Sequence, residues 1–95
     1  MYVYAVTDAS GLIKIGLSRR GLGQRIDNLK RLHRGLRFIG AERAPNSRLR
    51  EAELHRHFAS QRVCGEWFSI TEDELLDVFS PNMEIMSVKQ ARALA

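Results

Sequence analysis

The sequence predicts a small α+β protein with about three strands and several helices in one domain. Its 95 residues, 44% hydrophobic and 27% charged, have the composition of a soluble domain with a modest core. Short stretches rich in aromatic and β-branched residues predict strands. Longer stretches with helical spacing, bounded by glycine or capping residues, predict helices between and after them.

The first element is a predicted β-hairpin, in which Tyr2–Thr7 and Leu12–Ile15 are strands joined by the turn residues Asp8–Gly11. If the register pairs Tyr4 with Lys14, the two Cβ atoms lie about 5 Å apart. The alternative is an edge hairpin with a solvent-facing lysine and half-buried tyrosines.

A basic, glycine-bearing connection leads into a helix predicted from Gly23 or Gln24 to His33. The apolar face of this helix is expected to comprise Leu22, Ile26, Leu29, Leu32 and His33. The same angular count places Arg25 between Leu29 and Leu32, so the arginine is expected to point inward.

Leu36–Ala44 reads as a third strand, and the helix that follows begins near Asn46 or Ser47, either of which suits an N-cap. Leu54, Phe58 and Ala52 define its apolar arc. Glu51 and His55 fall inside this arc. A buried carboxylate needs a cation, a hydrogen-bond network or a metal ion. A buried ion pair with Arg25, or a place at the rim of the core, would also satisfy it.

After a loop over residues 59–65 comes the apolar stretch 66–70, and Thr71–Glu74 forms a capping box that opens a short helix ending near Pro81. A further helix is predicted over residues 88–94. We therefore expect a domain over residues 1–80 and an extension over residues 81–95.

Positive charge is concentrated in the middle of the chain. Between Lys14 and Arg62, 13 Lys and Arg residues stand against four acids, although the net charge of the whole chain is only +4. An excess of arginine suits a polyanion, since a guanidinium can grip a phosphate with two hydrogen bonds. Nucleic acid is thus the expected partner, and a merely solvated basic surface is the alternative. The candidate phosphate-binding residues are Arg19, Arg20, Lys30, Arg31 and Arg34.

No apolar run approaches the roughly 20 residues that span a bilayer, so no membrane association is expected. Cys64 is the only cysteine, which excludes an internal disulfide and is compatible with a cytoplasmic location. Whether the protein is a monomer or a homodimer stays open.

Five motifs in order resemble the GIY-YIG endonuclease domain over Met1 to about Phe79. They are Tyr2-Val3-Tyr4, Lys14-Ile15-Gly16, Arg25, Glu51-Ala52-Glu53-Leu54-His55 and Gly65-Glu66-Trp67-Phe68. The chain is most similar to a small branch whose second motif reads Lys-Ile-Gly. The resemblance implies a central antiparallel sheet of about three strands flanked by helices, and cleavage of DNA.

The resemblance also implies roles for individual residues. Glu51 matches the glutamate that binds one Mg²⁺ or Mn²⁺, Arg25 the arginine that neutralises the scissile phosphate, and Tyr4 the tyrosine of the first motif. Tyr2 stands where the family has glycine, and Lys14 where it has a second tyrosine. His55, one turn beyond Glu51, is a candidate to contact phosphate or to orient the attacking water.

The general base is not fixed by the motifs. Tyr4 would serve if a neighbouring Lys14 ammonium lowered its pKa from about 10. Lys14 itself, deprotonated by burial, is the second candidate, and Tyr2 and His55 come next.

Two functions of different class follow: a metal-dependent DNA endonuclease, or a DNA-binding module of the same fold that cuts slowly or not at all. An inward carboxylate facing a polyanion favours the enzyme, because it repels phosphate unless a cation intervenes. RNA is not excluded as the substrate. A zinc site of His55, His57 and Cys64 lacks the usual paired spacing, and Trp67 and Phe68 are expected to belong to the core.

Overall fold

Five strands form one antiparallel sheet in the order β3-β1-β2-β5-β4. The computed structural model describes residues 1–19 and 21–81. The strands are β1 (Tyr2–Thr7), β2 (Ile13–Ser18), β3 (Arg37–Arg43), β4 (Arg62–Cys64) and β5 (Trp67–Phe68). The predicted α+β fold is confirmed, and its three expected strands are β1, β2 and β3. The sheet has two more strands, β4 and β5. They were not predicted because, at three and two residues, they are too short to show an alternating pattern.

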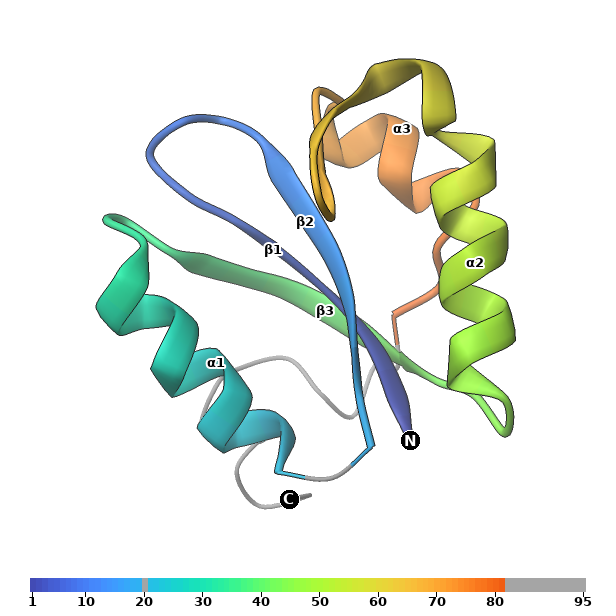
Figure 1. Cartoon of the computed structure of the whole chain (residues 1–95), viewed down its shortest axis with the longest axis horizontal. Helices are drawn as coiled ribbons and strands as arrows, with labels where there is room; N and C mark the ends of the chain where they lie inside the picture. Colours follow the sequence, from blue (N-terminus) through green and yellow to red (C-terminus); the bar gives the residue numbers. More distant parts are fainter. Residues whose placement is uncertain (20, 82–95) are drawn as a thin grey trace.

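Helices cover both faces of this sheet (Figure 1). The helix α1 (Leu22–Leu32) lies on one face, while α2 (Ser47–His57) and α3 (Glu72–Leu76) lie on the other. A short 3-10 turn, η1 (Ala59–Gln61), leads from α2 into β4.

Alternation along β1 divides the core in two. Tyr2, Tyr4 and Val6 pack with α1, whereas Val3 and Ala5 pack with the residues of α2 and α3. A side chain from α1 and one from α2 can therefore meet only at an edge or an end of the sheet.

The hairpin register differs from the pairing considered above. Tyr4 lies opposite Gly16, and Lys14 lies opposite Val6. Tyr4 and Lys14 still share a sheet face, because Lys14 lies two residues from Gly16, the residue paired with Tyr4. They are diagonal neighbours rather than a directly opposed pair.

The buried stripe of α1 is narrower than its sequence pattern indicated. Its buried residues are Leu22, Gly23, Ile26 and Leu29. Leu32 is 77% exposed, so the expectation that it belongs to the apolar face packed on the core is wrong. Arg25 is exposed too, but its side chain lines a polar cavity together with Glu51, which agrees with its expected inward direction. At 100° per residue these two positions lie only 20° apart on one margin of the predicted face, and the helix leans onto the sheet toward the opposite margin, where Gly23 lies.

On α2, Leu54 and Phe58 are buried, and Glu51 and His55 are half-buried, as expected. Ala52 is exposed, which corrects the predicted arc, because it lies 100° around the helix from Glu51. The predicted cap is confirmed: the side chain of Asn46 accepts a hydrogen bond from Leu49 N at 3.1 Å.

The capping box of α3 is also confirmed, because Thr71 and Glu74 exchange hydrogen bonds between side chain and backbone. The helix itself ends at Leu76, earlier than predicted, and the chain continues through a turn to Phe79. The predicted helix over residues 88–94, nearly all of the 81–95 extension, and Arg20 lie outside the described residues.

Candidate functional site at the edge of β2

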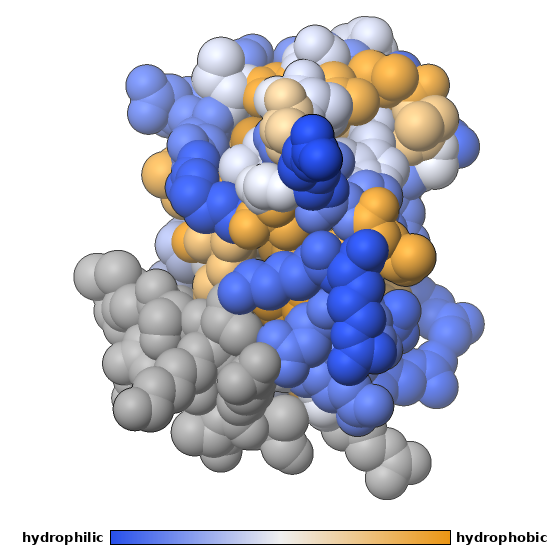
Figure 2. All heavy atoms as spheres, turned by 90° about the vertical axis from the view of Figure 1, so that its left-hand side faces the viewer, coloured by the Kyte–Doolittle hydropathy of each residue, from blue (hydrophilic) through white to orange (hydrophobic). Residues whose placement is uncertain are grey.

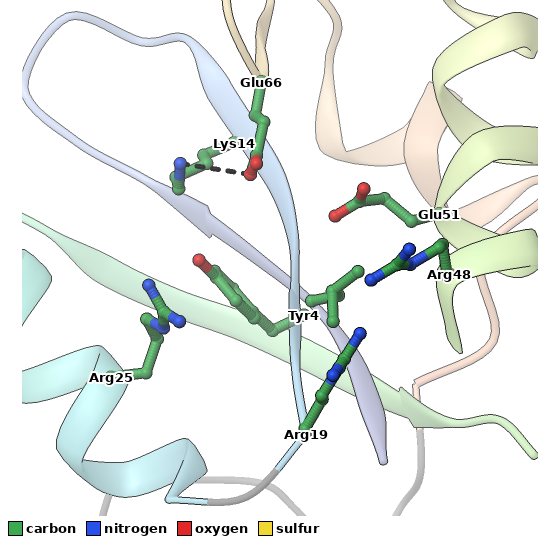
Figure 3. A pocket seen from close by; sticks show the side chains of 8 residues that line it. Tyr4, Lys14, Arg19, Arg25, Arg48, Glu51 and Glu66 are labelled. Carbon is green, nitrogen blue, oxygen red and sulfur yellow. Dashed lines mark ion pairs between the residues drawn. The ribbon is translucent and has the colours of Figure 1, made fainter. Parts of the chain in front are cut away.

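A polar cavity of about 440 Å³ lies beside the second half of β2. Its lining residues come from β1, β2, α1, α2 and the turn before β5: Tyr4, Lys14, Leu17, Arg19, Arg25, Arg48, Glu51 and Glu66. Figure 3 shows the charged side chains pointing toward a common space in front of β2. The cavity brings together four of the six residues predicted to be catalytic, and one of these, Glu51, is also the predicted metal ligand.

The cavity exists because β5 covers only part of β2. The partner strand pairs with Ile13 and Lys14. The ladder then ends with Ile15 N, which donates to Glu66 O at 3.0 Å. Beyond Ile15 the strand is an edge, so Glu51 from one face of the sheet and Arg25 from the other both reach the same space.

Tyr4 stands over Gly16 in this cavity and is only 1% exposed. A Cβ atom on Gly16 would lie 2.5 Å from Tyr4 Oη and 2.6 Å from Tyr4 Cζ. Such contacts are far shorter than carbon and oxygen atoms tolerate. Glycine in the Lys-Ile-Gly motif therefore leaves room for the phenol ring.

The pKa of Tyr4 is raised to about 12, chiefly because burial disfavours the phenolate. Glu66 raises the pKa further, and Arg25 opposes that shift. The expectation that Lys14 lowers this pKa is wrong, because the cation that acts on Tyr4 in that direction is Arg25.

Lys14 is instead paired with Glu66. Its Nζ lies 3.2 Å from Glu66 Oε2 and 5.8 Å from the centre of the Trp67 ring. The contact with Glu66 engages the Lys14 amine, so this arrangement gives no support to Lys14 as the general base. Trp67 packs at the edge of the core that contains Tyr4, and Phe68 is fully buried, which confirms that both belong to the core.

Glu51 enters the cavity from α2, and its pKa is raised, first by burial and then by the charge of Glu66. His55, Lys14 and Arg48 act in the opposite direction. No ion pair joins Glu51 to Arg25 within residues 1–19 and 21–81, so a buried pair of that kind does not explain the carboxylate. Two carboxylates thus share one cavity. The charge of Glu66 makes ionisation of Glu51 harder, and Glu66 is itself paired with Lys14.

Arg25 reaches the cavity from α1, and Figure 3 shows its guanidinium group turned toward the hydroxyl end of Tyr4. Arg19, at the end of β2, and Arg48, on α2, approach from the other side of Tyr4. The sequence analysis predicted Arg19 as a site residue but not Arg48. Helical spacing could have indicated Arg48, because it lies three residues before Glu51 and hence on the same side of α2.

His55 does not line the cavity. Its Nε2 lies 2.9 Å from the carbonyl oxygen of Ile15, and because a carbonyl only accepts, the imidazole donates this hydrogen bond. Its ring also meets the edge of Phe68. His55 therefore fastens α2 to the edge strand, and the expected contact with phosphate or water finds no support in this arrangement.

Other predicted site residues lie elsewhere. Tyr2 is buried and accepts a hydrogen bond from Arg43 Nη2 at 3.3 Å, away from the cavity. Lys30, Arg31 and Arg34 are exposed on or just after α1, and they do not line the cavity either. Figure 2 looks onto this side of the molecule and shows hydrophilic side chains gathered there.

The donor set can be tested for a metal ion. Among the residues that the structure describes, no group of three or more His, Cys, Asp and Glu side chains could hold one, so His55, His57 and Cys64 form no zinc site. Mg²⁺ differs from zinc, since it keeps several waters and is commonly held by one or two carboxylates. Glu51 and Glu66 satisfy that requirement.

Within the described part of the chain, no helix is long and apolar enough to cross a membrane.

Fold and site together define a class: an α+β domain with a cationic cavity, bearing two carboxylates, at the open edge of its sheet. Comparison with protein families assigns the chain more closely. It belongs to the T5orf172 domain family, whose model matches residues 1–82, and this family is associated with nucleases. Neither the curated proteins nor the solved structures gave a match.

Proposed function

We propose that this domain is a metal-dependent endonuclease that hydrolyses phosphodiester bonds of DNA. The observation that carries the proposal is the cavity at the β2 edge, where two carboxylates face four cationic side chains. A site for phosphate alone would have no use for Glu51, because a carboxylate repels a phosphate unless a cation lies between them. The GIY-YIG resemblance supports the same assignment, since its motif residues Tyr4, Arg25 and Glu51 line this cavity.

Glu51 and Glu66 would hold Mg²⁺ or Mn²⁺. Bound there, the ion would supply Lewis acidity to a phosphoryl oxygen and stabilise the leaving 3′ oxygen. Arg25 binds a nonbridging oxygen on the other side of Tyr4 and meets the charge that develops on the phosphate.

Tyr4 acts in this proposal as a neutral hydroxyl. With its pKa at about 12, the phenol is protonated near neutral pH and can orient the attacking water by hydrogen bonding. Packing against Gly16 fixes where that hydroxyl points. Lys14 holds the Glu66 carboxylate in place.

A DNA-binding module that cuts slowly or not at all is the second candidate. The observation in its favour is that neither of the first two base candidates is ready to accept a proton in the free protein: Tyr4 has a raised pKa, and Lys14 is paired with Glu66. Metal-dependent cleavage of DNA distinguishes the enzyme from the binding module.

The test uses plasmid DNA, and a structured RNA in parallel, with Mg²⁺, Mn²⁺ or EDTA. The parent should cut DNA only with metal, and Glu51→Gln should not cut, because it removes a ligand charge. Glu53→Gln is the matched control, since Glu53 is on the same helix, exposed, and outside the cavity. Equal cleavage rates for Glu51→Gln and the parent in Mg²⁺ would contradict the metal role.

Thermal stability provides a second readout. Mg²⁺ should raise the melting temperature of the parent and of Glu53→Gln but not of Glu51→Gln. Without metal, the raised pKa of Glu51 means that its ionisation opposes folding. Glu51→Gln should therefore be more stable than the parent at neutral pH, and the difference should vanish at acid pH, where Glu51 is protonated in both folded and unfolded states. A lower melting temperature at neutral pH would show that Glu51 is not strained by burial.

A further inference from the structure

A second cavity adjoins the first. It has a volume of about 270 Å³ and is lined by Met1, Arg19, Asn46, Ser47 and Arg48. Arg19 and Arg48 line both cavities, so the two spaces meet at this pair of guanidinium groups. Figure 3 shows the two side chains approaching each other from the end of β2 and from the first turn of α2.

The two cavities differ in charge. Glu51 and Glu66 line the first. Among residues 1–19 and 21–81, no carboxylate lines the second, and the charged side chains there are the two arginines. Asn46 and Ser47 add polar groups at the start of α2. The second cavity therefore suits an anion without help from a metal ion.

Neither arginine is engaged in an ion pair with any residue in ranges 1–19 and 21–81. Elsewhere in the fold, arginines that serve structure do form such pairs: Arg50 binds Glu42, and Arg37 binds Glu72. Both side chains are exposed, and the charge of Arg48 also acts on Glu51 in the first cavity. Two guanidinium groups that are directed at one space and held there by no ion pair can grip a phosphate that enters it, which points to a ligand.

We propose that Arg19 and Arg48 bind a second phosphate, the neighbour of the scissile one on the same strand. This inference rests on the proposed function, because it takes the first cavity as the place of cleavage. Since the cavities share two residues, a strand that lies in the first continues directly into the second. The substrate is then a strand with a phosphate on that side of the cut, which means internal linkages are cleaved in preference to terminal ones.

The first part of the test measures binding without cleavage. Affinity for a DNA duplex is measured in EDTA at several salt concentrations for the parent, the Arg19→Gln/Arg48→Gln double variant and Arg56→Gln. Loss of one phosphate contact should reduce the slope of log K against log[salt] by about 0.9 in the double variant. Arg56 is on the same helix, exposed and outside both cavities, so its variant is the control for charge. An unchanged slope in the double variant, or an equal fall in Arg56→Gln, would overturn the proposal.

The second part locates the phosphate. Single methylphosphonates, which lack the negative charge, replace each linkage next to the cleaved one, and single-turnover rates are measured with Mg²⁺. The parent should lose on the order of tenfold in rate at one neighbouring linkage. The double variant should lose nothing further at that linkage. Equal losses in both proteins would overturn the assignment.

Failure of the inference and failure of the proposed function are separable. If the parent cuts DNA but the double variant shows the parent's salt slope, the second phosphate site is wrong and the nuclease stands. If the slope falls as expected but no metal supports cleavage by the parent, Arg19 and Arg48 hold a phosphate in a binding module, and the nuclease is wrong.

Discussion

Replacement of Gly16 by alanine tests whether packing beneath Tyr4 sets the geometry of the site. The added Cβ would meet Tyr4 Oη at 2.5 Å, Tyr4 Cζ at 2.6 Å and Glu66 Oε2 at 2.9 Å. Ordinary contacts between such atoms lie near 3.5 Å, so the methyl group overlaps the phenol by about 1 Å. Tyr4 is buried and cannot swing into solvent, so the ring or the strand must shift.

Overpacking of a buried site by one methyl group costs about 1–3 kcal/mol. For a domain of this size, each kcal/mol lowers the melting temperature by about 4–8 °C. We expect Gly16→Ala to melt on the order of 10 °C below the parent. Cleavage should fall more than stability alone explains at a temperature where both proteins are folded, because Tyr4 and Glu66 are displaced together.

Urea denaturation followed by the fluorescence of Trp67, the only tryptophan, measures the loss of stability. A double-mutant cycle with Tyr4→Leu assigns its cause: without the aromatic ring, the alanine should cost clearly less than it does beside tyrosine. Equal costs in both backgrounds, or a Gly16→Ala protein with the stability and the cleavage rate of the parent, would refute the argument.

Two further predictions concern carboxylates. Glu66→Gln removes one of the two proposed metal ligands, so metal-dependent cleavage should be slower and should need more Mg²⁺. It also removes a charge that raises the pKa of Glu51, so the pH at which the remaining cleavage is lost on acidification, measured at saturating Mg²⁺, should move lower. A pH–rate profile with an unmoved acid limb would exclude this coupling. Glu42→Ala should cost on the order of 3 kcal/mol in urea denaturation, because Arg50, in a mostly buried position, loses the two hydrogen bonds of 2.8 and 3.0 Å to Glu42 and keeps only its contacts with Glu53 and the Val78 carbonyl. A double variant in which Arg50 is also replaced by leucine should recover part of the loss, and no recovery would show that the ion pair is not the cause.

The sequence predicted the fold where its patterns are local. Alternation and turn residues identified the first hairpin, and capping residues located the starts of α2 and α3. The inward position of Glu51 also followed from helical spacing, because its neighbours on that face, Leu54 and Phe58, are strongly apolar. These features depend on residues close together in the chain, and the structure confirms them.

Features that depend on packing between distant segments were not predictable in the same way. Leu32 has the helical angle of a core residue, yet the helix α1 buries its Gly23 side on the sheet and leaves Leu32 exposed. The pairing of Lys14 with Glu66 requires β5 to lie beside β2, and a two-residue strand has no periodicity to reveal this. The electrostatic partner of Tyr4 was mistaken for the same reason.

The edge of β2 explains why the site lies where it does. A sheet with helices on both faces normally keeps their side chains apart, and here the short β5 leaves half of β2 uncovered. His55 uses this edge, since its imidazole donates to the Ile15 carbonyl at the point where the ladder with β5 ends. This contact fixes the position along β2 of Glu51, which lies one helical turn before His55. The next residue of the strand after Ile15 is Gly16, and the ring of Tyr4 packs against it. The Glu-x-x-Leu-His and Lys-Ile-Gly motifs therefore contact each other in the structure. The hydrogen bond between the histidine and the strand carbonyl positions the helix, and the glutamate and the glycine shape the cavity beside it.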